Sequence, residues 1–325
     1  MDTLCSDIYR IIFAFLSSGN VFSLRQISNF FNELISNGNL DKIIIRSRYF
    51  YNTSHIKNLY FDIKLPHEHT PQSYDNVISI TTGIYTSKTI DQHIKKFTNI
   101  TTLSLAHTNN ICDRDLFPLK NLTYLSLYNQ IGITNQCLLQ LKNLVRLTIS
   151  NTTIISNDVL PQLINLNSLT LTLTHHITNS SIEKLTNLKS LKLVDNHMID
   201  GTVAHFLTNL TSLKCGRNIS DDNLSLLIKL TTLKIYCGDK ICGNFLSILS
   251  NITKLTICQS EQITDTQIQF GINIRYLNII NIPKITYNGL SFLTSLTILY
   301  CCRNQMTKSG AEKMPKLKKL NGNYI

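Results

Sequence analysis

The chain has 325 residues, 43% of them hydrophobic and 16% charged, with 12 Gly and 6 Pro, a composition that excludes an intrinsically disordered chain. Its nine cysteines form no CxxC pair, which argues against a zinc finger and predicts reduced thiols inside a cell. The net charge of +11 favours an acidic partner of some kind.

The first elements predicted in chain order are two short helices within residues 1–45. Apolar residues recur at helical spacing at Ile8, Ile12, Phe15 and Leu16, and again at Leu24, Ile27, Phe31 and Leu34. The apolar run at 11–16 (IIFAFL) is far shorter than the roughly 18 residues that span a bilayer. The acidic Asp2 and Asp7 before it are unlike the basic start of a secretion signal. We therefore interpret the run as the buried face of a helix and expect neither a signal nor a membrane segment.

The order of residue types in these helices is more specific than their spacing. Residues 4–16 read LCSDIYRIIFAFL and residues 24–34 read LRQISNFFNEL. They resemble the two signatures of an F-box, L-P-x-E-I-L-x-x-I-F-x-x-L and L-R-x-V-S-x-x-W-x-x-L, with Cys5, Tyr9 and Phe31 in place of Pro, Leu and Trp. The resemblance implies docking on a Skp-type adaptor through Leu4, Cys5, Ile8, Ile12, Phe13, Leu16, Leu24 and Ile27. The alternative interpretation is a helical cap that closes the end of the fold that follows.

From about residue 100 the chain repeats itself. Segments such as NLTYLSLYNQIGITNQCLLQLK (121–142) and NLNSLTLTLTHHITNSSIEKLT (165–186) align without gaps. Their leading apolar residues are spaced by 22, with one spacing of 20 and one of 21, and they are Ile100, Leu122, Leu144, Leu166, Leu188, Leu210, Leu230, Ile252, Ile274, Leu296 and Leu317. Two weaker copies begin at Ile56 and Val77.

Each repeat predicts a strand, a turn and a short helix. An L-x-x-L-x-L stretch alternates apolar and polar residues, as a half-buried strand does. Ile-Thr or Ile-Ser then precedes Asp or Asn, and a polar side chain there can cap the first helical turn. Apolar residues spaced by three, as in Ile182, Leu185 and Leu188, suit a short helix packed on the strand. One repeat cannot bury its apolar face alone, whereas stacked repeats share a core.

These segments resemble leucine-rich repeats over about residues 55–325. The resemblance implies an α/β fold, a right-handed solenoid with a parallel sheet on its concave face and short helices on its convex face. We expect about 12–13 repeats of 22 residues in a domain spanning 46–325, after the F-box-like domain at 1–45. The Asn or Cys that the family carries after the strand is present at Asn196, Asn218 and Asn304, whereas Thr108, Thr152, Thr174 and Ser260 stand at other copies. Gln130, Gly238 and Ile282 lack the usual group, which leaves the local geometry near 238 and 282 open.

Alternation along the strands predicts which side chains leave the core. The residues between the strand leucines include Lys192, Lys214 and Lys234 in consecutive repeats, with Lys254 diagonal to them. Like charges about 5 Å apart repel, and an acidic or phosphorylated ligand would relieve the repulsion. The predicted target-binding residues are Tyr124, Tyr128, Arg146, Lys192, Lys214, Lys234, Tyr236, Lys254, Tyr276 and Tyr300. The alternative is a solvated lysine-rich face that keeps the sheet soluble.

Nothing in the sequence nominates a catalytic site. The motifs GxxxxGK[ST], GxSxG and HExxH do not occur, so we expect no enzyme and no cofactor. The cluster His67-Glu68-His69 is more typical of a polar loop than of a metal site.

Together the two resemblances imply the substrate receptor of an SCF-type (Skp–cullin–F-box) ubiquitin ligase, which reaches a cullin through its adaptor. Such a protein is expected in the cytoplasm or nucleus. The alternatives are a stand-alone repeat scaffold and a nucleic-acid-binding protein with steep salt dependence. The abundance of Asn, Ile and Lys is typical of an AT-rich genome, as in some protists and large DNA viruses, and in a virus the adaptor would be the host's.

Overall fold

The computed structural model describes residues 94–108, 110–302, 310, 313–321 and 323–324, and the backbone of three earlier strands at 43–45, 59–61 and 79–81. Contacts divide the chain into two compact units, residues 1–155 and residues 156–325. The predicted adaptor-binding residues, His67-Glu68-His69 and Asn304 all lie outside the described residues. The helical domain predicted for residues 1–45 therefore stays a prediction.

The first unit is built from short parallel strands and single helical turns. Its elements are β1 (Ile43–Ile45), β2 (Leu59–Phe61), β3 (Ser79–Thr81), η1 (Ile94–Lys96), β4 (Thr102–Ala106), α5 (Asp113–Leu116), β5 (Tyr124–Tyr128), α6 (Asn135–Gln140) and β6 (Arg146–Ser150). Strand β1 pairs in parallel with β2, and β3 to β6 pair in parallel in chain order. Strands β2 and β3 fall in the two weaker repeat copies, as predicted, whereas the repeat pattern did not predict β1.

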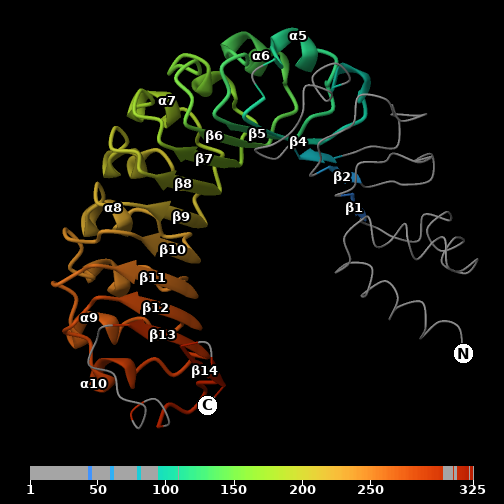
Figure 1. Ribbon diagram of the computed structural model, residues 1–325. Helices are drawn as coiled ribbons and strands as arrows, with labels where there is room; N and C mark the ends of the chain where they lie inside the picture. The colour runs from blue at the N-terminus through green and yellow to red at the C-terminus, as the bar shows by residue number, and fades with distance from the viewer. Residues whose placement is uncertain are drawn as a thin grey trace, which may run out of the picture. The chain divides into compact units, whose positions relative to one another are not determined.

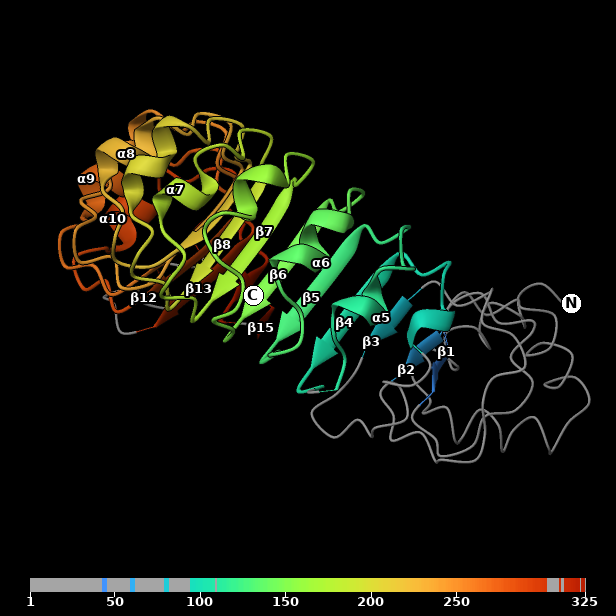
Figure 2. The ribbon, with the colours of Figure 1, turned by 90° about the horizontal axis from the view of Figure 1, so that it is seen from above.

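The second unit continues the same alternation. Its elements are η2 (Leu160–Gln162), β7 (Ser168–Thr172), α7 (Asn179–Ile182), β8 (Ser190–Val194), η3 (Gly201–His205), β9 (Ser212–Cys215), α8 (Asp221–Ser225), β10 (Thr232–Ile235), η4 (Asn244–Ser247), β11 (Lys254–Cys258), α9 (Asp265–Ile268), β12 (Tyr276–Ile280), α10 (Tyr287–Leu290), β13 (Ile298–Cys302), β14 (Lys319–Leu320) and β15 (Asn323–Tyr324). Strands β7 to β14 pair in parallel in chain order, and β15 turns back antiparallel onto β14. Helices α7 to α10 lie on the side of the stack opposite the strands (Figures 1 and 2).

The core of each unit lies between its strands and its helical turns. Leu169 and Leu171 of β7 are fully buried, and so are Ile182 and Leu188 on the helical side of the same repeat. Because equal repeat lengths place equivalent residues in register, Leu169 is paired with Leu191 of the next strand. The predicted strand, turn and helix of each repeat are thereby confirmed for the repeats that the structure describes.

In most repeats, one residue just after the strand has a left-handed backbone conformation. Eight described residues share this place, with φ between 48° and 58°: His107, Asn129, Asn151, Leu173, Asp195, Cys237, Gln259 and Asn281. Cys237 and Asn281 keep this turn although Gly238 and Ile282 lack the family's polar side chain. The backbone of Gly238 donates to the carbonyl of Cys258 at 3.0 Å, and Ile282 is fully buried. The turn geometry near 238 and 282, left open by the sequence, is thus regular.

The predicted polar caps begin most of the helical turns. The hydroxyl of Thr134 accepts a hydrogen bond from the backbone of Gln136, and that of Thr286 accepts one from Asn288. Such a cap satisfies a backbone N–H that the short helix leaves without an intrahelical partner. None of the described helices is long and apolar enough to cross a membrane.

Candidate functional site

Three lysines stand side by side on the strand face of the second unit. The strand register pairs Lys192 with Lys214 and Lys214 with Lys234 on β8, β9 and β10. The neighbouring strand residues Leu213 and Leu233 are buried in the core, so strand alternation directs the lysines outward. We call Lys192, Lys214 and Lys234 the lysine row.

The central lysine of the row is the most constrained. Burial lowers the pKa of Lys214, the positive charges of Lys192 and Lys234 lower it further, and the carboxylate of Asp195 opposes the shift most weakly. The Nζ of Lys214 lies 4.6 Å from the centroid of the Tyr236 ring, and this cation–π contact offsets part of the cost of its charge. An acidic group over the row would favour the charged form of Lys214.

The remaining predicted residues of the second unit extend the same face. Lys254 is exposed and lies opposite Thr232 and Tyr276 in register, two residues before the level of the lysine row along the strands. The rings of Tyr276 and Tyr300 lie 5.8 Å apart between centroids. The face is therefore basic over β8 to β11 and aromatic over β10 to β13.

Three predicted residues lie on β5 and β6 of the first unit. The Cζ of Arg146 lies 5.1 Å from the centroid of the Tyr124 ring on the adjacent strand. Tyr128 is 43% exposed and makes an edge contact with His107 at 5.0 Å between centroids. The structure thus brings Tyr124 and Arg146 together, with Tyr128 on the same strand as Tyr124.

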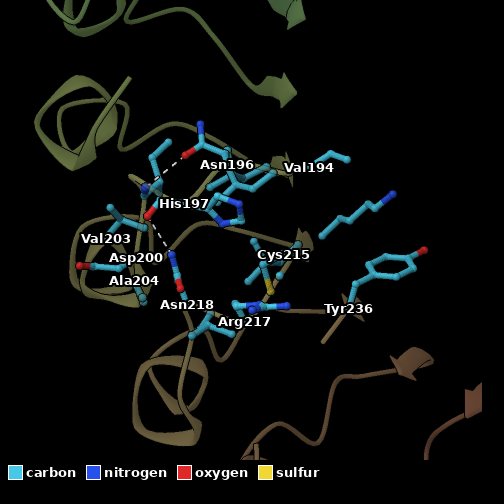
Figure 3. Close-up of a pocket in the computed structure, with 18 of the residues that line it drawn as sticks. Val194, Asn196, His197, Asp200, Val203, Ala204, Cys215, Arg217, Asn218 and Tyr236 are labelled. Atoms are coloured by element: carbon cyan, nitrogen blue, oxygen red, sulfur yellow. Dashed lines mark hydrogen bonds between the residues drawn. The ribbon is translucent and has the colours of Figure 1, made fainter. Parts of the chain in front are cut away.

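A cavity of about 370 Å³ lies between the repeats of β8 and β9 and was not identified from the sequence. Its lining includes the apolar residues Leu193, Val194, Val203, Ala204 and Cys215 and the polar residues His197, Lys214 and Arg217 (Figure 3). The cavity therefore combines an apolar interior with a polar rim, and it borders the lysine row through Lys214.

The cavity arises where large core side chains are replaced by small ones. Ala204 stands where the repeats on either side have Ile182 and Leu224, and Cys215 stands where they have Leu193 and Ile235. Removing buried side-chain carbons without collapse leaves empty volume in a packed interior. Neither replacement by itself predicts a cavity from the sequence.

The repeat that contains Cys215 is also two residues shorter than its neighbours. Asn218 is followed directly by Ile219, whereas Asn196 and Ile199 have two residues between them. Core residues around this turn keep some exposure: Leu193 is 8% exposed, Ile219 7% and Cys215 5%, whereas Leu171 and Ile235 are fully buried. The spacing of 20 between Leu210 and Leu230 was the sequence signal that could have drawn attention to this place.

The described residues do not provide a metal site. No group of three or more of their His, Cys, Asp or Glu side chains is arranged to hold a metal ion. The interactions that this face can make are therefore those of positive charges, aromatic rings and an apolar cavity.

Neither a family model nor a curated protein sequence matches the chain. Solved structures do resemble it. A chain in the crystal structure of the Rad7 and Elc1 complex in yeast has a TM-score of 0.63 and 16% identity, with 98% of this chain and 92% of that chain covered. An internalin from Listeria monocytogenes has a TM-score of 0.52 and 18% identity, with 95% of each chain covered. The fold is a leucine-rich-repeat solenoid.

The leucine-rich-repeat fold agrees with the strand-and-turn architecture of both units. It accounts for a parallel strand face in which each repeat contributes one short row of outward side chains. At these levels of identity the two likenesses concern the fold alone, and the residues of the strand face determine which partner this chain can bind.

Proposed function

We propose that this chain binds a partner protein that carries an acidic segment, and that the lysine row is the centre of the binding face. The observation that carries the proposal is the half-buried Lys214 between Lys192 and Lys234, with its pKa lowered by burial and by both neighbours. Carboxylates or phosphates placed over β8 to β10 would neutralise these charges. Such complementarity contributes to the choice of partner and to the rate of association.

We also propose that the bound partner is a substrate of an SCF-type ubiquitin ligase for which this chain is the receptor. The F-box-like order of residues in 4–16 and 24–34 supports this part of the proposal. In this arrangement the N-terminal helices dock on a Skp-type adaptor, and the leucine-rich repeats hold the target. The chemical steps of ubiquitin transfer belong to other subunits.

The binding face is tested with a fluorescein-labelled polyglutamate peptide and the full chain. Changing Lys192, Lys214 and Lys234 together to Glu should weaken binding by at least about tenfold, because three attractions become repulsions. The matched control changes the exposed Lys184, Lys240 and Lys284 to Glu, which alters net charge equally away from the lysine row. Equal loss in both variants would contradict a specific face. A preference for a single-stranded oligonucleotide over the peptide would favour nucleic-acid binding instead.

The ligase assignment is tested by mixing the purified full chain with a Skp-type adaptor. We expect a stable complex on gel filtration, and we expect the double variant Ile8→Asp, Phe13→Asp to lose it because charge would enter the docking face. The circular dichroism of that variant should keep the signal of the repeats. If the unaltered chain binds no adaptor, the chain is a stand-alone repeat scaffold and the ligase assignment is wrong.

A further inference from the structure

We propose that the cavity beside the lysine row is an anchor pocket that receives one large apolar side chain from the partner's acidic segment. The inference rests on the proposed function and adds that the acidic segment bound at the lysine row carries a large apolar side chain. We call this cavity, which is lined by Leu193, Val203, Ala204, Cys215 and Ile219, the anchor pocket, and we assign its mouth to Val194, Gly216 and Tyr236, which also line it.

The mouth of the anchor pocket opens on the same face as the lysine row. The strand register pairs Cys215 with Ile235, so Gly216 follows beside Tyr236, and it likewise follows beside Val194 on the other side. These three positions continue the outward side of the strands, and Gly216 contributes no side chain to it. A Cβ built at Gly216 would meet nothing nearer than the carbonyl oxygen of Tyr236 at 3.8 Å. There is therefore room for a Cβ over Gly216 without a clash.

The interior of the pocket matches an apolar group. Its walls are leucine, isoleucine, valine and alanine side chains and the thiol of Cys215, whose pKa burial raises to about 12. At neutral pH this thiol is protonated and behaves as a small apolar group. The volume of about 370 Å³ falls in the range of roughly 300–1,000 Å³ that is typical of ligand pockets. A leucine or phenylalanine side chain therefore fits.

The rim of the pocket matches acidic residues on either side of that apolar group. Lys214 and Arg217 supply positive charge at the rim, and Figure 3 shows Arg217 and His197 on opposite sides of Cys215. The carboxylate of Asp200 also lines the cavity, but it accepts hydrogen bonds from the backbone of Thr202 at 2.9 Å and from Asn179 at 2.8 Å. Asp195 is the other carboxylate that lines the cavity. Its effect on the pKa of Lys214 is weaker than that of either neighbouring lysine.

Lys214 connects the two parts of the site. It is the central member of the lysine row and also lines the cavity. One extended segment lying across β8 to β10 can therefore place acidic side chains on the row and turn one apolar side chain into the mouth beside it. This geometry favours a protein segment over a free small molecule as the occupant.

The pocket is tested with three fluorescein-labelled polyglutamate peptides that differ only in one central residue, Leu, Phe or Ala. The unaltered full chain should bind the central-Leu or central-Phe peptide at least about tenfold more tightly than the central-Ala peptide, because burial of the larger side chain is favourable. Gly216→Phe should abolish this preference by filling the mouth, while the acidic residues still bind. Gly216→Ala is the matched control and should keep the preference, since its Cβ has room.

The outcomes separate the pocket from the proposed function. Equal binding of all three peptides by the unaltered chain, with sensitivity to the lysine-row variant, would overturn the pocket and leave the function standing. Failure of every peptide to bind would overturn both. If Gly216→Phe does not fold by circular dichroism, Ala204→Leu fills the pocket from its inner wall and should remove the same preference. Retention of the preference in the folded variant would overturn the pocket.

Discussion

At the scale of single residues, Lys214 carries a positive charge that burial and two neighbouring lysines make unfavourable. Its side chain is half-buried between two like charges, and its ammonium lies over the Tyr236 ring. The Tyr236 hydroxyl has its own pKa raised, first by burial. The two side chains therefore meet at neutral pH as a cation and a neutral ring, which is the pairing that a cation–π contact requires.

The lowered pKa of Lys214 predicts a pH dependence of stability. Since the unfolded chain holds the Lys214 proton more tightly, this group's contribution to stability should rise with pH from the folded pKa up to the ordinary value of 10.5. The loss of stability caused by the Lys214 charge is fully present at neutral pH and is absent above pH 10.5, where the group is neutral in both states. Lys192→Gln should raise the pKa of Lys214, and Asp195→Asn should lower it, as followed by ¹³C NMR of the lysine side chain. An unchanged titration in Lys192→Gln would contradict the like-charge origin.

At the scale of secondary-structure elements, polar side chains join one repeat to the next. Side-chain amides at one repeated position donate to the backbone carbonyl of the preceding repeat, from Asn121, Asn143, Asn187, Asn209, Asn251 and Asn273. A second set comes from the first residue of the helical turns. The carboxylate of Asp265 accepts from the backbone of Thr286 at 2.8 Å, and that of Asp113 accepts from Thr134 at 2.7 Å.

Asp221 offers a test of this second set. Its carboxylate accepts from the backbone of Cys242 at 2.7 Å and from that of Phe245 at 3.2 Å. Asp221→Ala should lower the free energy of unfolding by about 2 kcal/mol, because two backbone donors lose their partner. Asp222→Ala is the matched control, since Asp222 is exposed on the same helix, and it should leave the urea midpoint unchanged. Equal effects of the two changes would show that the link between repeats contributes nothing specific.

At the scale of the whole molecule, a repeat fold is stabilised through contacts between neighbouring repeats. A cavity between two repeats therefore weakens one interface rather than the entire core. In the second unit that interface lies between the repeats of β8 and β9, where Ala204 and Cys215 replace larger residues.

Ala204→Leu is expected to strengthen this interface. Filling the cavity should raise the free energy of unfolding by about 1 kcal/mol. It should also slow amide hydrogen exchange within residues 190–231 more than in the repeats after them. His205→Leu adds the same side chain at an exposed position of η3 and should not stabilise. If Ala204→Leu destabilises the chain, the cavity is too narrow for the added side chain, and the assigned pocket shape is wrong.

Much of the fold was predictable because its signals are local and repeated. The L-x-x-L-x-L pattern, the spacing of 22 and the cap residues each recur many times, so one ambiguous copy does not mislead. The lysine row followed from the same regularity, since equal repeat length with alternation places Lys192, Lys214 and Lys234 on neighbouring strands. The binding of an acidic partner and the F-box-like segment remain predictions.

The repeating strand and helix, the buried leucines and the outward lysines were all predictable from the order of residues, because each depends on periodicity along the chain. The three-dimensional packing was needed to show that Ala204, Cys215 and Gly216 line one cavity beside Lys214. Each of these small residues is unremarkable in its own repeat. The cavity comes from packing across two repeats, one of which is shortened. Such packing depends on which side chains face each other in space and not on their order along the chain.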